Sequence, residues 1–291
     1  MERAFDELRQ AICQPGAMAD VTPAAMEDFA ANAVVALAVG GHGSRLGALT
    51  DAQGVNKNAV RLPSGDTMVE ITIRMYREAG FRQFVALVAH QAHSIVDVLG
   101  DGSKLDVTVT YSQDPDGGPA GRGGAIRNAL ENGTIPRSHS LVVHNPDDVI
   151  LNYPGSFPHD LVAAHLAGVE QGKLASAVIA EGLPATFTGM SVRDGVVEEV
   201  IPYPAIPVPA HVGVTVFSPA VYEKFDTLFG GTKRSDFEPV LFPVLVTERL
   251  LYSFFIPASC WIQVNDPKAW KTLVTALAVQ EAEESLVQTA S

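Results

Sequence analysis

Residues 34–57 read VVALAVGGHGSRLGALTDAQGVNK. The first six form a continuous apolar run bounded by glycine, a pattern typical of a strand that is covered on both faces. The glycines that follow carry no Cβ atom and let the backbone approach an anion closely. They are Gly40, Gly41 and Gly43. Arg45 and Lys57 add positive charge, so the stretch predicts a buried strand followed by a loop that binds a triphosphate.

The spacing of this loop does not match two other glycine-rich phosphate motifs. A P-loop places its lysine directly after the last glycine, whereas Gly47 is followed by Ala48. A dinucleotide fingerprint needs an acidic residue at the end of a second strand about 20 residues later. Residues 63–66 read Pro-Ser-Gly-Asp, which is typical of a turn.

The stretch instead closely resembles the signature Gly-Gly-x-Gly-Thr-Arg-Leu-x-Pro-Leu-Thr, then Pro-Lys, of the sugar-1-phosphate nucleotidylyltransferases (nucleoside diphosphate sugar pyrophosphorylases). Here it runs from Gly40 to Thr50, with Asn56-Lys57 in place of Pro-Lys. The resemblance covers about residues 33 to 275 and is strongest in the first third. It implies that Gly40, Gly41, Gly43 and Ser44 bind the nucleotide and that Arg45 and Lys57 are catalytic.

Strands and helices are expected to alternate along the chain. Apolar spacing and breakers predict helices over residues 2–13, 23–31, 67–79 and 94–99, and strands over residues 34–39, 84–89 and 107–111. Such alternation predicts an α/β fold with an open, mostly parallel, Rossmann-like sheet and helices on both faces. The resemblance implies the same, as a GT-A-like nucleotidyltransferase fold. We find no C-terminal β-helix repeat.

A second glycine-rich segment spans residues 113–126 and enters a predicted helix. Free amides at a helix start and a bare backbone suit packing against a base and a sugar. The segment resembles the family's Gly-Thr-Ala-Gly-Ala-Leu/Ile motif, which implies nucleotide binding by Gly121 and Gly124 and base reading by Gln113. A flexible surface loop is the alternative.

Asp147 and Asp148 follow an apolar strand over residues 141–143. Open α/β sheets bind ligands at the carboxyl ends of their strands, and magnesium takes one or two protein carboxylates beside phosphates and water. The family's Asn-Gly-Asp resembles this segment and implies that Asp147 binds Mg2+, with Asp148 as the alternative register. A turn or helix cap is the other explanation.

A second metal ligand is expected in the segment from Trp261 to Pro267, which resembles the one before the family's last helix. Asp266 is its only carboxylate and is the proposed ligand, although it lies farther from the tryptophan than the family's aspartate does. Asn265 and Gln263 compete for the role. Alternatively, Asp266 caps the helix that follows, because Asp-Pro favours a helix start.

The acceptor half matches the family least well. Residues 189–200 predict paired strands around an Asp-Gly turn, but the lysine that meets the acceptor phosphate in relatives is missing after them. Either Lys233 or Arg234 replaces it, or the acceptor is bound differently and these two residues belong to a solvated loop. The strand at His211-Val-Gly213 resembles the family's acceptor strand, which implies acceptor binding by Gly213 and His211.

The 291 residues carry a net charge of −13 and are 47% hydrophobic. This length suits one sizeable α/β domain or a domain with a small appendage. We expect an N-terminal helical extension (1–32), a nucleotidyltransferase domain (33–275) and a C-terminal helix or tail (276–291). The acidic excess argues against nucleic-acid and anionic-membrane partners, because such binding neutralises phosphates.

Cys13 and Cys260 are too few and too far apart for a disulfide framework or a zinc site. The acidic N-terminus lacks the features of a signal peptide, and no apolar stretch reaches the ~20 residues that span a bilayer. We therefore expect a cytoplasmic protein. Relatives often form dimers or tetramers, so a homo-oligomer is an option.

The resemblance implies a magnesium-dependent transfer of a nucleoside monophosphate from an NTP to a sugar 1-phosphate, giving an NDP-sugar and pyrophosphate. Two alternatives stay open. One is a non-catalytic regulatory subunit that binds nucleotide sugars. The other is a nucleotidyltransferase for a non-sugar phosphate, such as phosphocholine, or for a cyclitol phosphate. The first rests on the departures from Pro-Lys, from the acceptor lysine and from the usual place of the second aspartate, and the second rests on the four prolines in residues 202–209.

Overall fold

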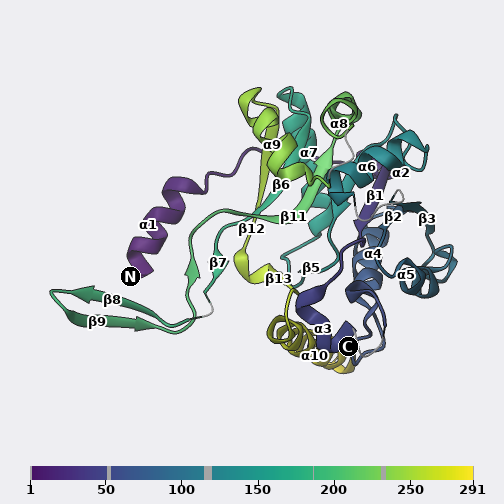
Figure 1. The fold of residues 1–291 in the computed structure, drawn as a ribbon. Coiled ribbons are helices and arrows are strands. Elements are labelled where there is room, and N and C mark those ends of the chain that lie inside the picture. The colour runs from purple at the N-terminus through teal and green to yellow at the C-terminus, as the bar shows by residue number, and fades with distance from the viewer. Residues whose placement is uncertain (1, 51–53, 115–119, 186, 231–233, 291) are drawn as a thin grey trace.

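A seven-stranded sheet forms the centre of the protein in a computed structural model that describes residues 2–50, 54–114, 120–185, 187–230 and 234–290 (Figure 1). Its strand order is β12-β6-β11-β4-β1-β2-β3. The strands are β1 (Ala33–Ala38), β2 (Gln83–Val88), β3 (Thr108–Gln113), β4 (Ser140–His144), β6 (Ala175–Ala180), β11 (Ala210–Phe217) and β12 (Leu251–Ile256). β11 is antiparallel to both neighbours, and the other neighbouring pairs are parallel. The mostly parallel sheet is confirmed.

Helices cover both faces of this sheet. Four pack on one face: α2 (Pro23–Ala31), α4 (Met68–Glu78), α5 (Ala92–Leu99) and α7 (Phe157–Glu170). Three pack on the other: α6 (Gly121–Glu131), α8 (Tyr222–Leu228) and α9 (Phe237–Thr247). The alternating side chains of β1 join both layers, since Val35 and Leu37 belong to the first core and Val34 and Ala36 to the second.

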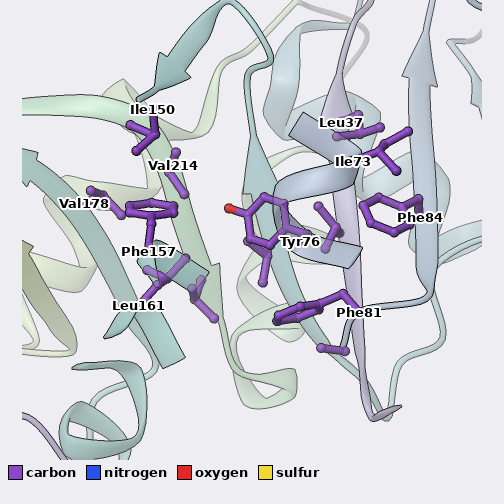
Figure 2. Packing of buried hydrophobic residues seen from close by; sticks show 14 of the residues in the cluster. Leu37, Ile73, Tyr76, Phe81, Phe84, Ile150, Phe157, Leu161, Val178 and Val214 are labelled. Carbon is purple, nitrogen blue, oxygen red and sulfur yellow. The ribbon is translucent and has the colours of Figure 1, made fainter. Parts of the chain in front are cut away.

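Tyr76 of α4 lies in the middle of the first core, close to Ile73 and Phe81 (Figure 2). Burial of its hydroxyl requires a partner, and the hydroxyl lies 3.0 Å from Nδ1 of His144. His144 ends β4, so this contact fixes the end of that strand from the core side.

The C-terminal part adds a third, smaller layer. β5 (Asp148–Ile150) pairs antiparallel with β13 (Trp261–Gln263). α10 (Pro267–Ala290) follows as one continuous helix, and the expected boundary at residues 275 and 276 falls inside it. Among the described residues no β-helix follows β13, as expected, and none of the helices is long and apolar enough to cross a bilayer.

Short elements complete the chain. They are α3 (Gly47–Thr50), β7 (Leu183–Pro184) paired with β10 (Ala205–Ile206), and the 3₁₀ turns η1 (Ser44–Leu46), η2 (Lys57–Ala59), η3 (Ser103–Leu105), η4 (Pro219–Val221) and η5 (Ala258–Cys260).

Two elements project from the body on the same side: α1 (Glu2–Ile12) and the hairpin of β8 (Gly189–Arg193) and β9 (Val196–Ile201) (Figure 1). Asp194 and Gly195 form the hairpin turn with φ of 49° and 82°, as the Asp-Gly signal predicts. One hairpin face is apolar and exposed: Met190, Val192, Val197 and Val200.

Both cysteines are free and buried. Cys13 Sγ lies 3.9 Å from the Glu181 carbonyl, and Cys260 Sγ lies 3.4 Å from the Asn152 carbonyl. Burial raises the pKa of both thiols.

Candidate active site

A cavity of about 350 Å³ opens at the carboxyl ends of β1, β2, β3 and β4. Its lining combines four cations, four carboxylates, three side-chain amides and an apolar patch. The cations are Arg45, Lys57, Arg122 and Arg234, and the carboxylates are Asp114, Asp147, Asp148 and Asp236. The cationic side chains can neutralise a bound anion, and the carboxylates can hold a metal cation that accompanies it.

Gly40 and Gly41 line this cavity at the end of β1. Gly43 lies behind them with φ +61°, and a Cβ there would come within 3.0 Å of Lys57 Cβ. The glycine therefore permits both the left-handed turn and the close approach of Lys57. Ser44 begins η1, and Arg45 lines the cavity with an exposed side chain.

Asn56, which stands where the family signature has proline, is only 1% exposed. Its Nδ2 donates to the carbonyls of Val39 (2.8 Å) and His90 (3.1 Å), and its Oδ1 accepts from Asn58 N–H at 3.0 Å. These bonds hold the backbone before Lys57, so hydrogen bonding supplies the rigidity that the proline ring supplies in the signature.

Lys57 and Asp147 form an ion pair across the cavity, with side chains only 14% and 11% exposed. Asp148 is 3% exposed. Its Oδ1 accepts from Trp261 Nε1 at 3.0 Å and from Gln263 Nε2 at 3.3 Å, while its Oδ2 accepts from Asn145 Nδ2 at 3.1 Å. Burial, and next the charge of Asp147, raises the pKa of Asp148 to about 7.

His144 links this carboxylate pair to the core. Its Nε2 lies 3.0 Å from the Asp148 carbonyl, and its Nδ1 lies 3.0 Å from the Tyr76 hydroxyl. Burial lowers the pKa of His144 to about 4. A neutral ring that donates from Nε2 and accepts from Tyr76 satisfies both contacts.

Gly213 packs directly behind the same carboxylate. Its φ is +69°, and a Cβ would lie 2.1 Å from Asp148 Oδ2 and 2.4 Å from Asn145 Nδ2. Gly213 does not line the cavity. It acts instead by leaving room for the side chains that do.

The start of α6 is held by the segment at 234–236. Ser235 O accepts the amides of Gly123 (3.0 Å) and Gly124 (3.3 Å), and Asp236 Oδ1 accepts the Arg122 amide at 2.9 Å. These amides are therefore bound within the protein, contrary to the expectation that they are free for a ligand. Gly121 lines the cavity with φ +74° and packs against the Ser235 backbone, whereas Gly124 does not line it.

Arg122 is held by ion pairs, and Gln113, the predicted base-reading residue, lies outside the cavity. The Arg122 guanidinium pairs with Asp236 (3.4 Å) and Glu238 (2.6 Å). Gln113 is exposed outside the cavity, and its carbonyl accepts from Asn128. The next residue, Asp114, lines the cavity instead.

Asp266 is exposed and its Oδ1 accepts the Ala269 amide at 2.8 Å. It does not line the cavity. The expectation that Asp266 binds the metal is therefore wrong, and this residue caps the start of α10 instead. Gln263 and Asn265, the competing candidates, both line the cavity.

Of the acceptor candidates, Arg234 lines the cavity, and Lys233 lies outside the described residues. His211 lies behind the cavity. Its Nε2 is 2.9 Å from Thr215 Oγ1 and 3.1 Å from the Val214 carbonyl, and burial lowers its pKa to about 4.

The donor set suits a magnesium ion. No group of three or more His, Cys, Asp or Glu within the described ranges forms a metal cage. Magnesium requires no such cage, because it takes oxygen ligands from one or two carboxylates and from phosphates and water. Asp147 lines the cavity, and Oδ1 of the neighbouring Asn145 is buried without a hydrogen-bond partner.

Sequence reasoning did not find Asn145 and Asp236. Asn145 follows β4 directly, and a polar residue at the carboxyl end of a strand is the signal that would have found it. Asp236 reaches the cavity through a contact with Arg122, 114 residues away in sequence, which no local pattern shows.

Comparison with known proteins gives three findings. The sequence model of the family described as "Nucleotidyl transferase" matches residues 34–273. A curated mannose-1-phosphate guanyltransferase from Pichia angusta is 26% identical over 237 residues, which cover 79% of this chain. The chain spans 60% of the length of that relative.

A solved structure, described as a putative glucose-1-phosphate thymidylyltransferase from Bacillus anthracis in complex with a sucrose, has the same fold. The TM-score is 0.61 at 15% identity, over 85% of this chain and 94% of that chain. At this identity the likeness concerns the fold alone.

Proposed function

This chain belongs to the nucleotidyl transferase family, and we propose that it transfers a nucleoside monophosphate from an NTP to a sugar 1-phosphate and releases pyrophosphate. The cavity carries this proposal, because it brings Asp147, which follows β4, together with Arg45 and Lys57 from the segment after the neighbouring strand β1. Both named relatives have a sugar 1-phosphate in their descriptions, which supports the acceptor class.

The reaction needs positioning and charge neutralisation. A phosphate oxygen of the acceptor is already anionic at neutral pH and attacks the α-phosphorus in line, so no protein nucleophile is required. Gly40 and Gly41 present the backbone to the phosphates. Arg45 stabilises the charge on the departing pyrophosphate, and Lys57 holds the α-phosphate region.

Asp147 would hold magnesium, with the free Oδ1 of Asn145 beside it. Bound magnesium would neutralise charge on the reacting phosphates. In the structure Lys57 already pairs with Asp147, so this lysine holds the carboxylate in place. Asp148 is held by three donors and orients the neighbouring amides.

Arg234 is proposed as the residue that meets the acceptor phosphate. It lines the cavity from the loop that follows α8, and among the described residues it is the one of the two sequence candidates that does so. Its guanidinium can bind a phosphate through two hydrogen bonds.

The test is pyrophosphate release with magnesium, across the common NTPs and a panel of sugar 1-phosphates. Arg45→Ala and Asp147→Asn should lower turnover by about 100- to 1000-fold, and Arg45→Ala, at an exposed side chain, should leave thermal unfolding unchanged. Arg193→Ala is the matched control, because Arg193 lies on the projecting hairpin with its side chain 76% exposed.

Release that depends on one NTP, one acceptor and Arg45 supports the transferase. Binding of nucleotide sugar without release from any pair would instead favour a regulatory subunit. That alternative rests on the absence of the family's acceptor lysine from the segment after β9.

A further inference from the structure

The strand order divides the cavity into two halves. β4, β1, β2 and β3 are neighbours in that order, and adjacent strands lie about 4.8 Å apart. Asp147 follows β4 and the phosphate loop follows β1, whereas Leu87 is in β2 and Asp114 follows β3. On the proposed function, phosphates over the β1 loop and reaction at Asp147 leave the β2 and β3 side for the nucleoside.

The apolar surface that a planar base needs comes from β1, β2 and α6. Ala38 from β1, Leu87 from β2 and Ala125 from α6 line it, and Leu87 and Ala125 are 3% and 7% exposed. A base that lies on these side chains would present its edge toward the end of β3. The polar group at that end therefore decides which bases fit.

Asp114 is that group. It is half-buried, and one oxygen, Oδ2, accepts the Ala120 amide at 2.6 Å. Within the described residues it forms no ion pair, although Arg234 acts on it at longer range. Asp236, the other carboxylate near α6, is already bound by the backbone and side chain of Arg122. Within the described part of the chain Asp114 Oδ1 accepts no hydrogen bond, so this carboxylate has acceptor capacity left for a ligand at the end of β3.

An ionised carboxylate only accepts hydrogen bonds, and it can accept two side by side. Guanine presents two adjacent donors, N1–H and the N2 amino group. Adenine and cytosine each place a ring acceptor beside their single amino group, and uracil and thymine place carbonyls on both sides of N3–H. A carboxylate at the base edge therefore favours guanine and repels the ring acceptors and carbonyls of the others.

We propose that Asp114 reads the Watson–Crick edge of guanine, so that the nucleotide substrate of this site is GTP. Gln113, which the sequence resemblance places in the base-reading role, is exposed outside the cavity, and its side chain accepts and donates equally. The assignment deepens the proposed function by naming the nucleotide, and its test does not depend on turnover.

The experiment measures binding of magnesium–NTP complexes to the full chain by calorimetry, with GTP, ATP, CTP, UTP, dTTP, ITP and XTP. We expect GTP to bind roughly 5- to 150-fold more tightly than ATP, CTP, UTP or dTTP, the factor of one bidentate base contact. ITP, which lacks the N2 amino group, should fall between GTP and the others.

Asp114→Asn is the decisive variant. Asparagine keeps an oxygen for the Ala120 amide and adds an NH₂ group. It should therefore lower the affinity for GTP by the same factor. It should also shift the preference toward XTP, because the C2 carbonyl of xanthine accepts a hydrogen bond from the NH₂ group. Asp97→Asn, on the exposed face of α5, controls for loss of a carboxylate and should leave both affinities unchanged.

Three outcomes would overturn the assignment: tighter binding of another NTP, a GTP preference that persists in Asp114→Asn, or a preference that disappears in Gln113→Ala but not in Asp114→Asn. Pyrophosphate release with a different NTP would refute the guanine assignment and leave the transferase standing. Selective GTP binding without pyrophosphate release would support the guanine assignment and refute the transferase.

Discussion

Gly213 stands where β11 passes behind Asp148, and its missing side chain leaves room for the side chains of Asp148 and Asn145. Gly213→Ala would combine a left-handed backbone with a clash against Asp148 Oδ2. We expect a loss of about 1–3 kcal/mol in the free energy of unfolding from the backbone alone, with further loss from the clash and a fall in turnover. Thermal unfolding and pyrophosphate release measure the two effects.

Gly195→Ala is the matched control for this change. Gly195 has φ +82° in the exposed hairpin turn, and a Cβ atom there would have open space within 4 Å. It carries the backbone penalty without the clash. Equal losses in the two variants would show that Gly213 serves only its own backbone conformation.

Two buried histidines and the partly buried His211 make stability depend on pH. Burial lowers the pKa values of His144, His165 and His211 from 6.5 to about 4. Below pH 6.5 these histidines bind protons in the unfolded chain but stay neutral in the folded protein until the pH approaches 4. Stability is therefore fully present above pH 6.5 and falls as the pH drops toward 4, by up to about 1.4 kcal/mol per pH unit for each histidine.

Chemical unfolding between pH 7 and 4 checks this dependence. His165→Gln, which keeps polar atoms for Ser176 and Ser218, should lose one such increment of slope. His159→Gln is the control, since the His159 side chain is 41% exposed. A slope that His165→Gln leaves unchanged would assign the pH effect to other groups.

Single residues also mark the limit of sequence reasoning at the site. The glycine-rich loop after β1 could be located at the cavity because its glycines set the local backbone geometry, and Gly40, Gly41 and Arg45 do line the cavity. The role of Asp266 could not be predicted, because an Asp-Pro pair suits both a helix cap and a metal ligand. Only the path of the folded chain distinguishes the two roles. Asp114 was passed over for Gln113 because one position along a strand end reverses which side chain faces the cavity.

At the scale of elements, the β8–β9 hairpin is predicted to contribute little to the fold. Its apolar residues Met190, Val192 and Val197 are 56%, 61% and 49% exposed. Replacing residues 189–201 by two glycines should shift the melting temperature by less than about 2 °C, because its ends pair directly at Gly189 and Ile201. Differential scanning calorimetry measures the shift.

Leu161→Ala on α7 provides the contrast, because Leu161 is 0% exposed in the main core. It should lower the free energy of unfolding by about 2–5 kcal/mol. A comparable loss on removing the hairpin would mean that its apolar face is covered in solution.

Local elements followed from sequence more readily than their arrangement. The capping box at Thr67 and Glu70 and the Thr22-Pro23 start identify α4 and α2 by chemistry within four residues. The antiparallel insertion of β11 between β4 and β6, and the pairing of β5 with β13 across more than 100 residues, depend on long-range packing that no local pattern encodes.

At the scale of the whole molecule, the two helices of the N-terminal region are expected to contribute unequally to stability. α1 projects into solvent, whereas Met26 and Ala30 of α2 belong to the main core. Removing residues 1–16 should leave the melting temperature nearly unchanged, and removing residues 1–32 should lower it strongly or abolish soluble expression. Equal behaviour of the two truncations would show that the expected extension acts as one unit.

The two buried thiols are natural reporters of local opening. Only a thiolate attacks an alkylating reagent, and Cys13 and Cys260 meet the reagent only when their surroundings open. Cys13 lies beside Glu181 near the chain start, and Cys260 lies beside Asn152, directly before β13. Pulsed alkylation read by mass spectrometry would therefore measure the opening rates of two separate regions in the unmodified chain, with and without nucleotide.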